Sequence, residues 1–153
     1  MVTLAALAGS CVMVLACGGK DTEPETPKLR LDDDGEIYVA DLVSRLSRGR
    51  FDLVELMMRE DAVADFPAAE IEAMWGELVA ALGEPEGQPR LLKVGTTPIT
   101  RDDGTIGFFG KASFEMARGI GEVHVEIACA THFDSHSSCR PPFLIVEMKM
   151  EAR

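Results

Sequence analysis

The chain has 153 residues, of which 26 are acidic and 15 are basic, and its formal net charge is -11 at pH 7. A surface with this charge repels phosphate groups, which excludes nucleic acids and anionic lipid headgroups as partners. The length fits one folded domain with a single hydrophobic core. No G-x-S-x-G, H-E-x-x-H, P-loop or dinucleotide-binding motif occurs, so the sequence offers no signature of the common hydrolases or nucleotide-binding enzymes.

The N-terminal segment, residues 1–16, is apolar and uncharged, and it ends in Val14-Leu15-Ala16 just before Cys17. This pattern resembles a bacterial lipoprotein signal, which implies cleavage before Cys17 and lipidation of that cysteine. The apolar run is too short to span a bilayer, which takes about 20 residues. We therefore expect a cell-envelope protein held by a lipid anchor. Gly18 in place of Asp implies the outer membrane if the organism has two membranes.

Residues 17–34 have the composition of a flexible tether, with Pro24, Pro27 and no periodic apolar face. The three aspartates at 32–34 suggest a calcium loop, but Arg30 and Asp41 occupy positions where the loop requires other ligands. The sequence therefore predicts that Asp34 caps the next helix and that the folded domain covers residues 35–153.

Three helices are predicted in the first half of this domain. Apolar residues recur at helical spacing from Glu36 to Leu46, and Gly49 follows as a stop. A shorter helix fits Phe51–Met58. The third has Pro67 at its first turn, contains Trp75, and ends at Gly83.

Beyond residue 87 the apolar residues alternate, which is typical of strands with one buried face. The predicted strands cover residues 90–100, 106–116, 123–129 and 143–150, with turns at Asp102–Gly104 and Gly119–Gly121. The expected architecture is α+β, with three N-terminal helices packed on a four-stranded antiparallel sheet. The helix that carries Trp75 is expected to cover the apolar face of the sheet.

A leucine-rich helix, a glycine, a Phe-Asp pair and a tryptophan helix ending in Leu-Gly follow one another between residues 37 and 83. This order resembles the bacterial domain of unknown function 3887 family. The resemblance implies a cone-shaped, cystatin-like or nuclear-transport-factor-like fold in an exported protein, sometimes ahead of an α/β-hydrolase domain. The sequence up to Arg153 contains no such hydrolase domain, so no catalytic role is carried over. The residues that match are Leu42–Leu46, Gly49, Phe51-Asp52, Val54, Trp75, Leu78 and Gly83.

One cluster of metal-binding residue types has the spacing C-x2-H-x3-H-x2-C, formed by Cys129, His132, His136 and Cys139. Two thiolates and two imidazoles suit a tetrahedral zinc knuckle. In an oxidising envelope, however, the two cysteines that remain after Cys11 is removed and Cys17 is lipidated favour a disulfide. If the third strand continues to Phe133, Cys129 and His132 point to opposite faces. We predict a Cys129–Cys139 disulfide, with zinc as the alternative.

The candidates for acid-base chemistry are His124, His132 and Asp134, with Glu126 or Glu115 on the same sheet. None of them forms a recognisable catalytic group by spacing, so we expect a non-catalytic binding or interaction module without a cofactor. A small enzyme or hydrolase accessory that uses the cone pocket is the alternative.

The ligand or partner of such a module is left open by the sequence. A pocket lined by Trp75, Phe108 and Phe114 would take a small apolar ligand. If these rings fill the space, an envelope protein or a second copy in a homodimer would use the outer sheet face instead.

Overall fold

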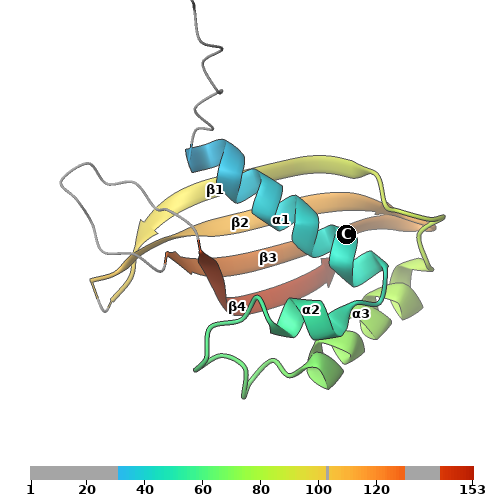
Figure 1. The fold of residues 1–153 in the computed structure, drawn as a ribbon. Coiled ribbons are helices and arrows are strands. Elements are labelled where there is room, and N and C mark those ends of the chain that lie inside the picture. The colour runs from blue at the N-terminus through green and yellow to red at the C-terminus, as the bar shows by residue number, and fades with distance from the viewer. Residues whose placement is uncertain (1–30, 103, 130–141) are drawn as a thin grey trace, which may run out of the picture.

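The computed structural model describes residues 31–102, 104–129 and 142–153. Three helices precede a four-stranded antiparallel sheet with the strand order β1-β2-β3-β4, which is the α+β arrangement predicted. The helices lie together on one face of the sheet (Figure 1). Their bounds are α1 Leu31–Ser47, α2 Phe51–Glu55 and α3 Ala68–Leu82, and the strands are β1 Leu91–Thr100, β2 Ile106–Met116, β3 Gly119–Cys129 and β4 Phe143–Ala152.

The core lies between the helices and the apolar face of the sheet. Helix α1 contributes Val39, Leu42 and Leu46, each with no exposed surface. Helix α3 places the Trp75 ring in a stacked arrangement on Phe114 of β2, with ring centroids 5.8 Å apart. The expected packing of the tryptophan helix on the apolar sheet face is therefore confirmed. Tyr38 of α1 ties the layers together, because its hydroxyl donates to the backbone oxygen of Phe143 at 3.0 Å.

The first helix begins earlier than predicted. Helix α1 starts at Leu31, so the prediction that Asp34 caps the helix is wrong, and the expected boundary between tether and domain falls inside the helix. An acidic residue in a first turn is favourable because it faces unpaired backbone N–H groups and the positive end of the helix dipole. The three aspartates at 32–34 therefore suit the first turn of α1 as well as a capping position before it.

The second helix is shorter than predicted, ending at Glu55 instead of Met58. The residues that follow pair with the edge strand β4. The Arg59 amide donates to the Ile145 oxygen at 2.8 Å, and the Ile145 amide donates to the Met57 oxygen at 2.8 Å. These bonds cover part of an edge that would otherwise be open, and they are incompatible with continued helix.

The bounds of α3 agree with the prediction. Pro67 occupies the N-cap position and Gly83, with a φ of 74°, occupies the C-cap. Proline has no side-chain group that could cap the helix. The Glu55 carboxylate of α2 accepts a hydrogen bond from the Ala68 amide at 2.5 Å instead, so α2 caps α3.

The four strands are confirmed, but the turn between β2 and β3 lies elsewhere. The turn consists of Ala117 and Arg118, and the glycines predicted to form it belong to β3. A Cβ atom at Gly121 would lie 2.6 Å from the Phe114 ring, and one at Gly119 would lie 2.9 Å from the Leu82 side chain. These glycines are therefore required for packing and not for turning.

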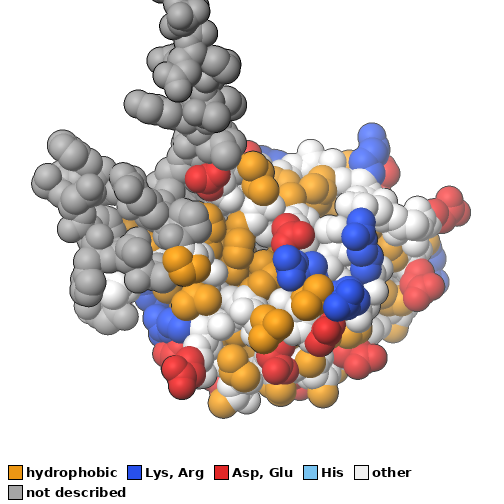
Figure 2. Space-filling model, in the orientation of Figure 1, with side chains coloured by type: hydrophobic (Ala, Val, Ile, Leu, Met, Phe, Trp, Pro, Cys, Tyr) orange, Lys and Arg blue, Asp and Glu red, His pale blue; other side chains and the backbone are white. Residues whose placement is uncertain are grey.

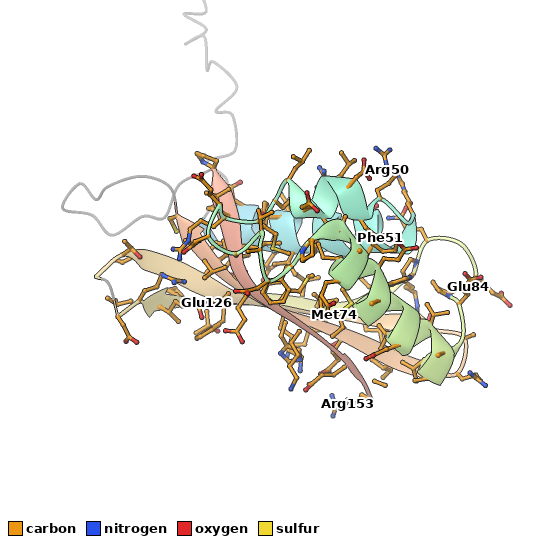
Figure 3. The ribbon with its side chains drawn as sticks, turned by 90° about the horizontal axis from the view of Figure 1, so that it is seen from below. Arg50, Phe51, Met74, Glu84, Glu126 and Arg153 are labelled. Atoms are coloured by element: carbon orange, nitrogen blue, oxygen red, sulfur yellow. The ribbon has the colours of Figure 1, made fainter. Side chains whose placement is uncertain are left out.

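The two surfaces of this domain differ in character. The helical surface carries apolar side chains interspersed with acidic and basic ones (Figure 2). Seen from below, the side chains of Glu126 and Arg153 lie on the side of the sheet away from the helices (Figure 3). We call this side the outer face; no described helix covers it.

Candidate functional site

The outer face of the sheet carries a hollow with a volume of about 840 Å³. All four strands contribute side chains to it, because in a strand every second residue points to the same face. The lining combines charged groups with hydroxyl groups and one exposed aromatic ring. The side chains that line it are Lys93 and Thr97 of β1, Phe109, Lys111 and Ser113 of β2, Glu122, His124 and Glu126 of β3, and Glu147, Lys149 and Glu151 of β4, with Arg153 at the end of the chain.

The register of the strands arranges these charges in rows that cross the sheet. Like charges directly opposite one another destabilise a sheet, so each row needs compensation from its neighbours. Lys111 lies 2.8 Å from Glu122, and Lys149 contacts Glu151, which links adjacent rows. The basic row consists of Lys111, His124 and Lys149, and the acidic pairs on either side are Glu122–Glu151 and Glu126–Glu147.

Glu122 is the most buried charged group of the outer face, with 7% of its side chain exposed. Its carboxylate accepts hydrogen bonds from Lys111 and from the Ser113 hydroxyl at 3.1 Å, and His124 Nε2 lies 3.3 Å away. Lys111 is the main cause that lowers the pKa of Glu122 to about 2, against the opposing effect of burial. The carboxylate is therefore ionised at neutral pH and holds three side chains in place.

Glu122, His124 and Glu151 are the residue types that bind metal ions, and one ligand atom from each lies within 4.8 Å of the others. Both carboxylates, however, already contact a lysine ammonium group. A divalent cation would have to displace these lysines and then remain beside their positive charges. The arrangement is an ion-pair network, and it does not fit a metal without rearrangement.

At the end of the hollow formed by Glu126 and Glu147, only one of the two carboxylates has a basic partner among the described residues. Glu126 contacts Arg101, whose side chain is 13% exposed. Glu147 lies directly across from Glu126 and forms no ion pair with a residue in the described ranges.

A gap opens in the outer face at Gly95 of β1. A Cβ atom built there would meet nothing within 4 Å. Gly95 lies opposite Lys111, and its neighbours on the same face of β1 are Lys93 and Thr97. Thr97 lies opposite Phe109, which is 50% exposed, whereas the aromatic residues that face the core on β2 and β4 are buried. The gap is thus bordered by two ammonium groups, a hydroxyl and an aromatic ring.

The acid-base candidates from the sequence are separated by the structure. His124 and Glu126 lie in the hollow, whereas Glu115 is paired with Arg90 outside it. Within the described ranges His124 makes no hydrogen bond to Ser113, because Glu122 lies between them. His124 is therefore not placed to take a proton from the serine hydroxyl. His132 and Asp134 lie outside the described residues.

Cys129, the last residue of β3, is disulfide-bonded. Its predicted partner Cys139 and the alternative zinc ligands His132 and His136 lie outside the described residues, so the pairing stays a prediction. Cys17 also lies outside them, and lipidation stays a prediction as well.

The three rings of the predicted apolar pocket lie in the core. Trp75 stacks on Phe114, and Phe108 meets the edge of Phe143 with centroids 5.2 Å apart. All three are buried, with exposed fractions of 8% for Trp75, 4% for Phe108 and 0% for Phe114. None of them lines the hollow of the outer face.

The hollow was not identified from the sequence. Alternation does indicate that Lys111, Ser113, Glu122 and His124 face away from the core. Alternation within one strand does not specify the register that brings residues of different strands into one row. It also does not reveal the open space at Gly95.

No helix in the described ranges is both long and apolar enough to cross a membrane. Comparison with known proteins identified no matching family model, no matching curated protein and no matching solved structure.

Proposed function

We propose that this chain is a lipid-anchored, non-catalytic binding module of the cell envelope, and that it binds its ligand or partner on the outer face of the sheet. The observation that carries the binding role is the hollow of about 840 Å³ on a sheet face that no described helix covers. This volume is within the range of about 300–1,000 Å³ typical of small-molecule sites. The cone-like shape implied by the family resemblance belongs to the same proposal.

The anchor rests on the N-terminal sequence. An apolar, uncharged segment ends in Val14-Leu15-Ala16 before Cys17, and a proline-containing polar segment follows. Several acyl chains on one cysteine would hold the protein firmly, whereas its charge of -11 would not attract it to an anionic membrane.

The outer face is a better candidate for binding than the space between the helices and the sheet. That space contains Trp75, Phe108 and Phe114 in contact with other rings and with little exposed surface. A ligand there would have to separate a close-packed core. The outer face needs no such rearrangement.

A non-catalytic role is favoured by the way the reactive groups of the hollow are engaged. Glu122 is held by Lys111 and Ser113, and its pKa of about 2 makes it a poor base at neutral pH. His124 lies 3.3 Å from Glu122 and 3.5 Å from Glu151, in a position to link carboxylates.

Binding is tested by mapping amide chemical shifts of the isotope-labelled full chain while small fragments of varied charge are added. We expect the changes to cluster on outer-face residues such as Lys111, His124 and Lys149. Changes confined to the helical surface, or none anywhere, would contradict the proposed site.

Anchoring is tested separately by the intact mass of the protein extracted from membranes without reductant. The expected mass begins at Cys17 and includes acyl chains, and the Cys17→Ser variant should be unmodified and released from the membrane. A wild-type chain that keeps residues 1–16 would contradict the anchor. A bound zinc ion lost on denaturation would instead support the zinc alternative.

A further inference from the structure

We infer that the gap at Gly95 binds the carboxylate of a small organic anion whose apolar part packs on Phe109. The inference rests on the proposed function, since it names the ligand class for the outer-face site.

The first argument is the charge at the gap. Of the lysines in the described ranges, Lys111 and Lys149 contact Glu122 and Glu151, whereas Lys93 forms no ion pair with a described residue. In a chain with 26 acidic and 15 basic residues, a lysine without an ion-pair partner among the described residues is unexpected. No group in the described part of the chain occupies the Lys93 ammonium, so it can bind a carboxylate from solution, and such charge-assisted bonds are among the stronger hydrogen bonds in proteins.

The second argument is the space. Gly95 has no side chain, and nothing lies within 4 Å of the position that its Cβ would take. Lys93 precedes it by two residues on the same face, and Lys111 lies directly across on β2. A carboxylate over Gly95 would thus lie between two ammonium groups. Lys111 has three donor hydrogens, so it can contact the ligand and still hold Glu122.

The third argument is the aromatic ring beside the gap. Phe109 is 50% exposed, and Thr97 lies opposite it. An apolar group that extends from a carboxylate over Gly95 toward Phe109 would remove ring surface from water, and the Thr97 hydroxyl is available to a polar substituent. The combination selects an anion with an apolar body, because a purely polar anion would leave the ring exposed.

The experiment uses benzoate and hexanoate as probes, with benzamide as the neutral analogue and benzylamine as the cationic one. Affinity is measured on the full chain by titration followed by amide chemical shifts. We expect saturable changes at Gly95, Lys111 and Phe109 with both carboxylates, and much weaker changes with benzamide and benzylamine. Lys93→Gln should weaken carboxylate binding about tenfold, the order expected for losing one charge-assisted hydrogen bond.

The decisive variant is Gly95→Leu, which places a side chain in the gap. The φ of Gly95 is outside the left-handed region and its Cβ position is open, so this variant should fold. Gly76→Leu is the matched control, because Gly76 lies on α3 and is also open. Arg48→Gln controls for the loss of a positive charge, since Arg48 is exposed and contacts Gln88 instead of a carboxylate. Carboxylate binding should be lost in Gly95→Leu and unchanged in both controls.

The inference is overturned if Gly95→Leu binds benzoate as well as the wild type does, or if benzamide binds as tightly as benzoate. Outer-face shifts with neutral or cationic fragments, but not with carboxylates, would overturn this inference and leave the proposed function standing. An outer face that responds to no fragment would overturn both.

Discussion

The two faces of the sheet are built from the same strands, yet they differ in burial and in charge. On the inner face Phe114, Val123 and Ile127 have no exposed surface and pack under the helices. On the outer face Lys111, His124 and Lys149 lie in a row with acidic pairs on either side. The inner face therefore accounts for the stability of the domain, and the outer face is free to carry a binding site. Substitutions on the two faces should separate these roles.

The largest effect is expected from a matched pair of phenylalanines on β2. Phe114 is fully buried against Trp75, so Phe114→Ala should lower the free energy of unfolding by about 3–5 kcal/mol. Phe109 is 50% exposed, and Phe109→Ala should cost about 1 kcal/mol or less. Urea denaturation of both variants measures the difference. Equal losses would show that the outer face is also part of the stabilising core.

A second pair of substitutions compares two glycines on neighbouring strands. A Cβ atom at Gly110 would lie 2.5 Å from the Val39 side chain, so Gly110→Ala must displace that side chain and should cost about 1–3 kcal/mol. Gly95→Ala enters open space, and it should leave stability unchanged or raise it by about 0.5–1 kcal/mol because alanine loses less backbone entropy. Thermal unfolding is the measurement. Destabilisation by Gly95→Ala would contradict the gap.

A smaller effect is expected at the junction of the helical layer with β4. The Tyr38 hydroxyl donates to the backbone oxygen of Phe143 at 3.0 Å and lies 3.3 Å from that of Met57. Its pKa is raised mainly by burial, so the group stays neutral. Tyr38→Phe keeps the ring and should cost about 1 kcal/mol, the typical net value of a hydrogen bond. A loss comparable to that of Phe114→Ala would contradict this account.

The smallest effect at neutral pH is expected at Glu122. Its partners Lys111 and His124 are 45% and 37% exposed, so solvent screens the network, and Glu122→Gln should cost less than about 1 kcal/mol. The sign of the pH dependence is nevertheless definite. Because the pKa of Glu122 is lowered from 4.5 to about 2 in the folded state, its contribution is present above pH 4.5 and is lost as the pH falls toward 2.

Acid unfolding of the wild type and Glu122→Gln measures this contribution. Their stabilities should converge below about pH 2. A gap between them that widens on acidification would contradict the lowered pKa.

Local patterns predicted the ends of an element correctly where the backbone preference of a single residue decides them. Pro67 and Gly83 mark the ends of α3 because their backbone preferences do not depend on the rest of the chain. A prediction was wrong where contacts with residues distant in the sequence explain why a residue type is present. Gly121 was predicted to form a turn, but it belongs to β3. A glycine suits this position because the Phe114 ring occupies the space where a side chain would be.

The sequence by itself determined the α+β order, the faces of the strands and the acidic character of the chain, because these follow from residue type and local spacing. The tertiary structure alone decided which residues meet on the outer face. A register shift between Glu126 and Ile127 sets the pairs that β3 makes with β4, and a change of one residue would move every side chain of β4 to the other face. The basic row depends on the alignment of β3 with its neighbours, and the groups around Gly95 depend on the alignment of β1 with β2. No local pattern specifies these alignments between distant segments.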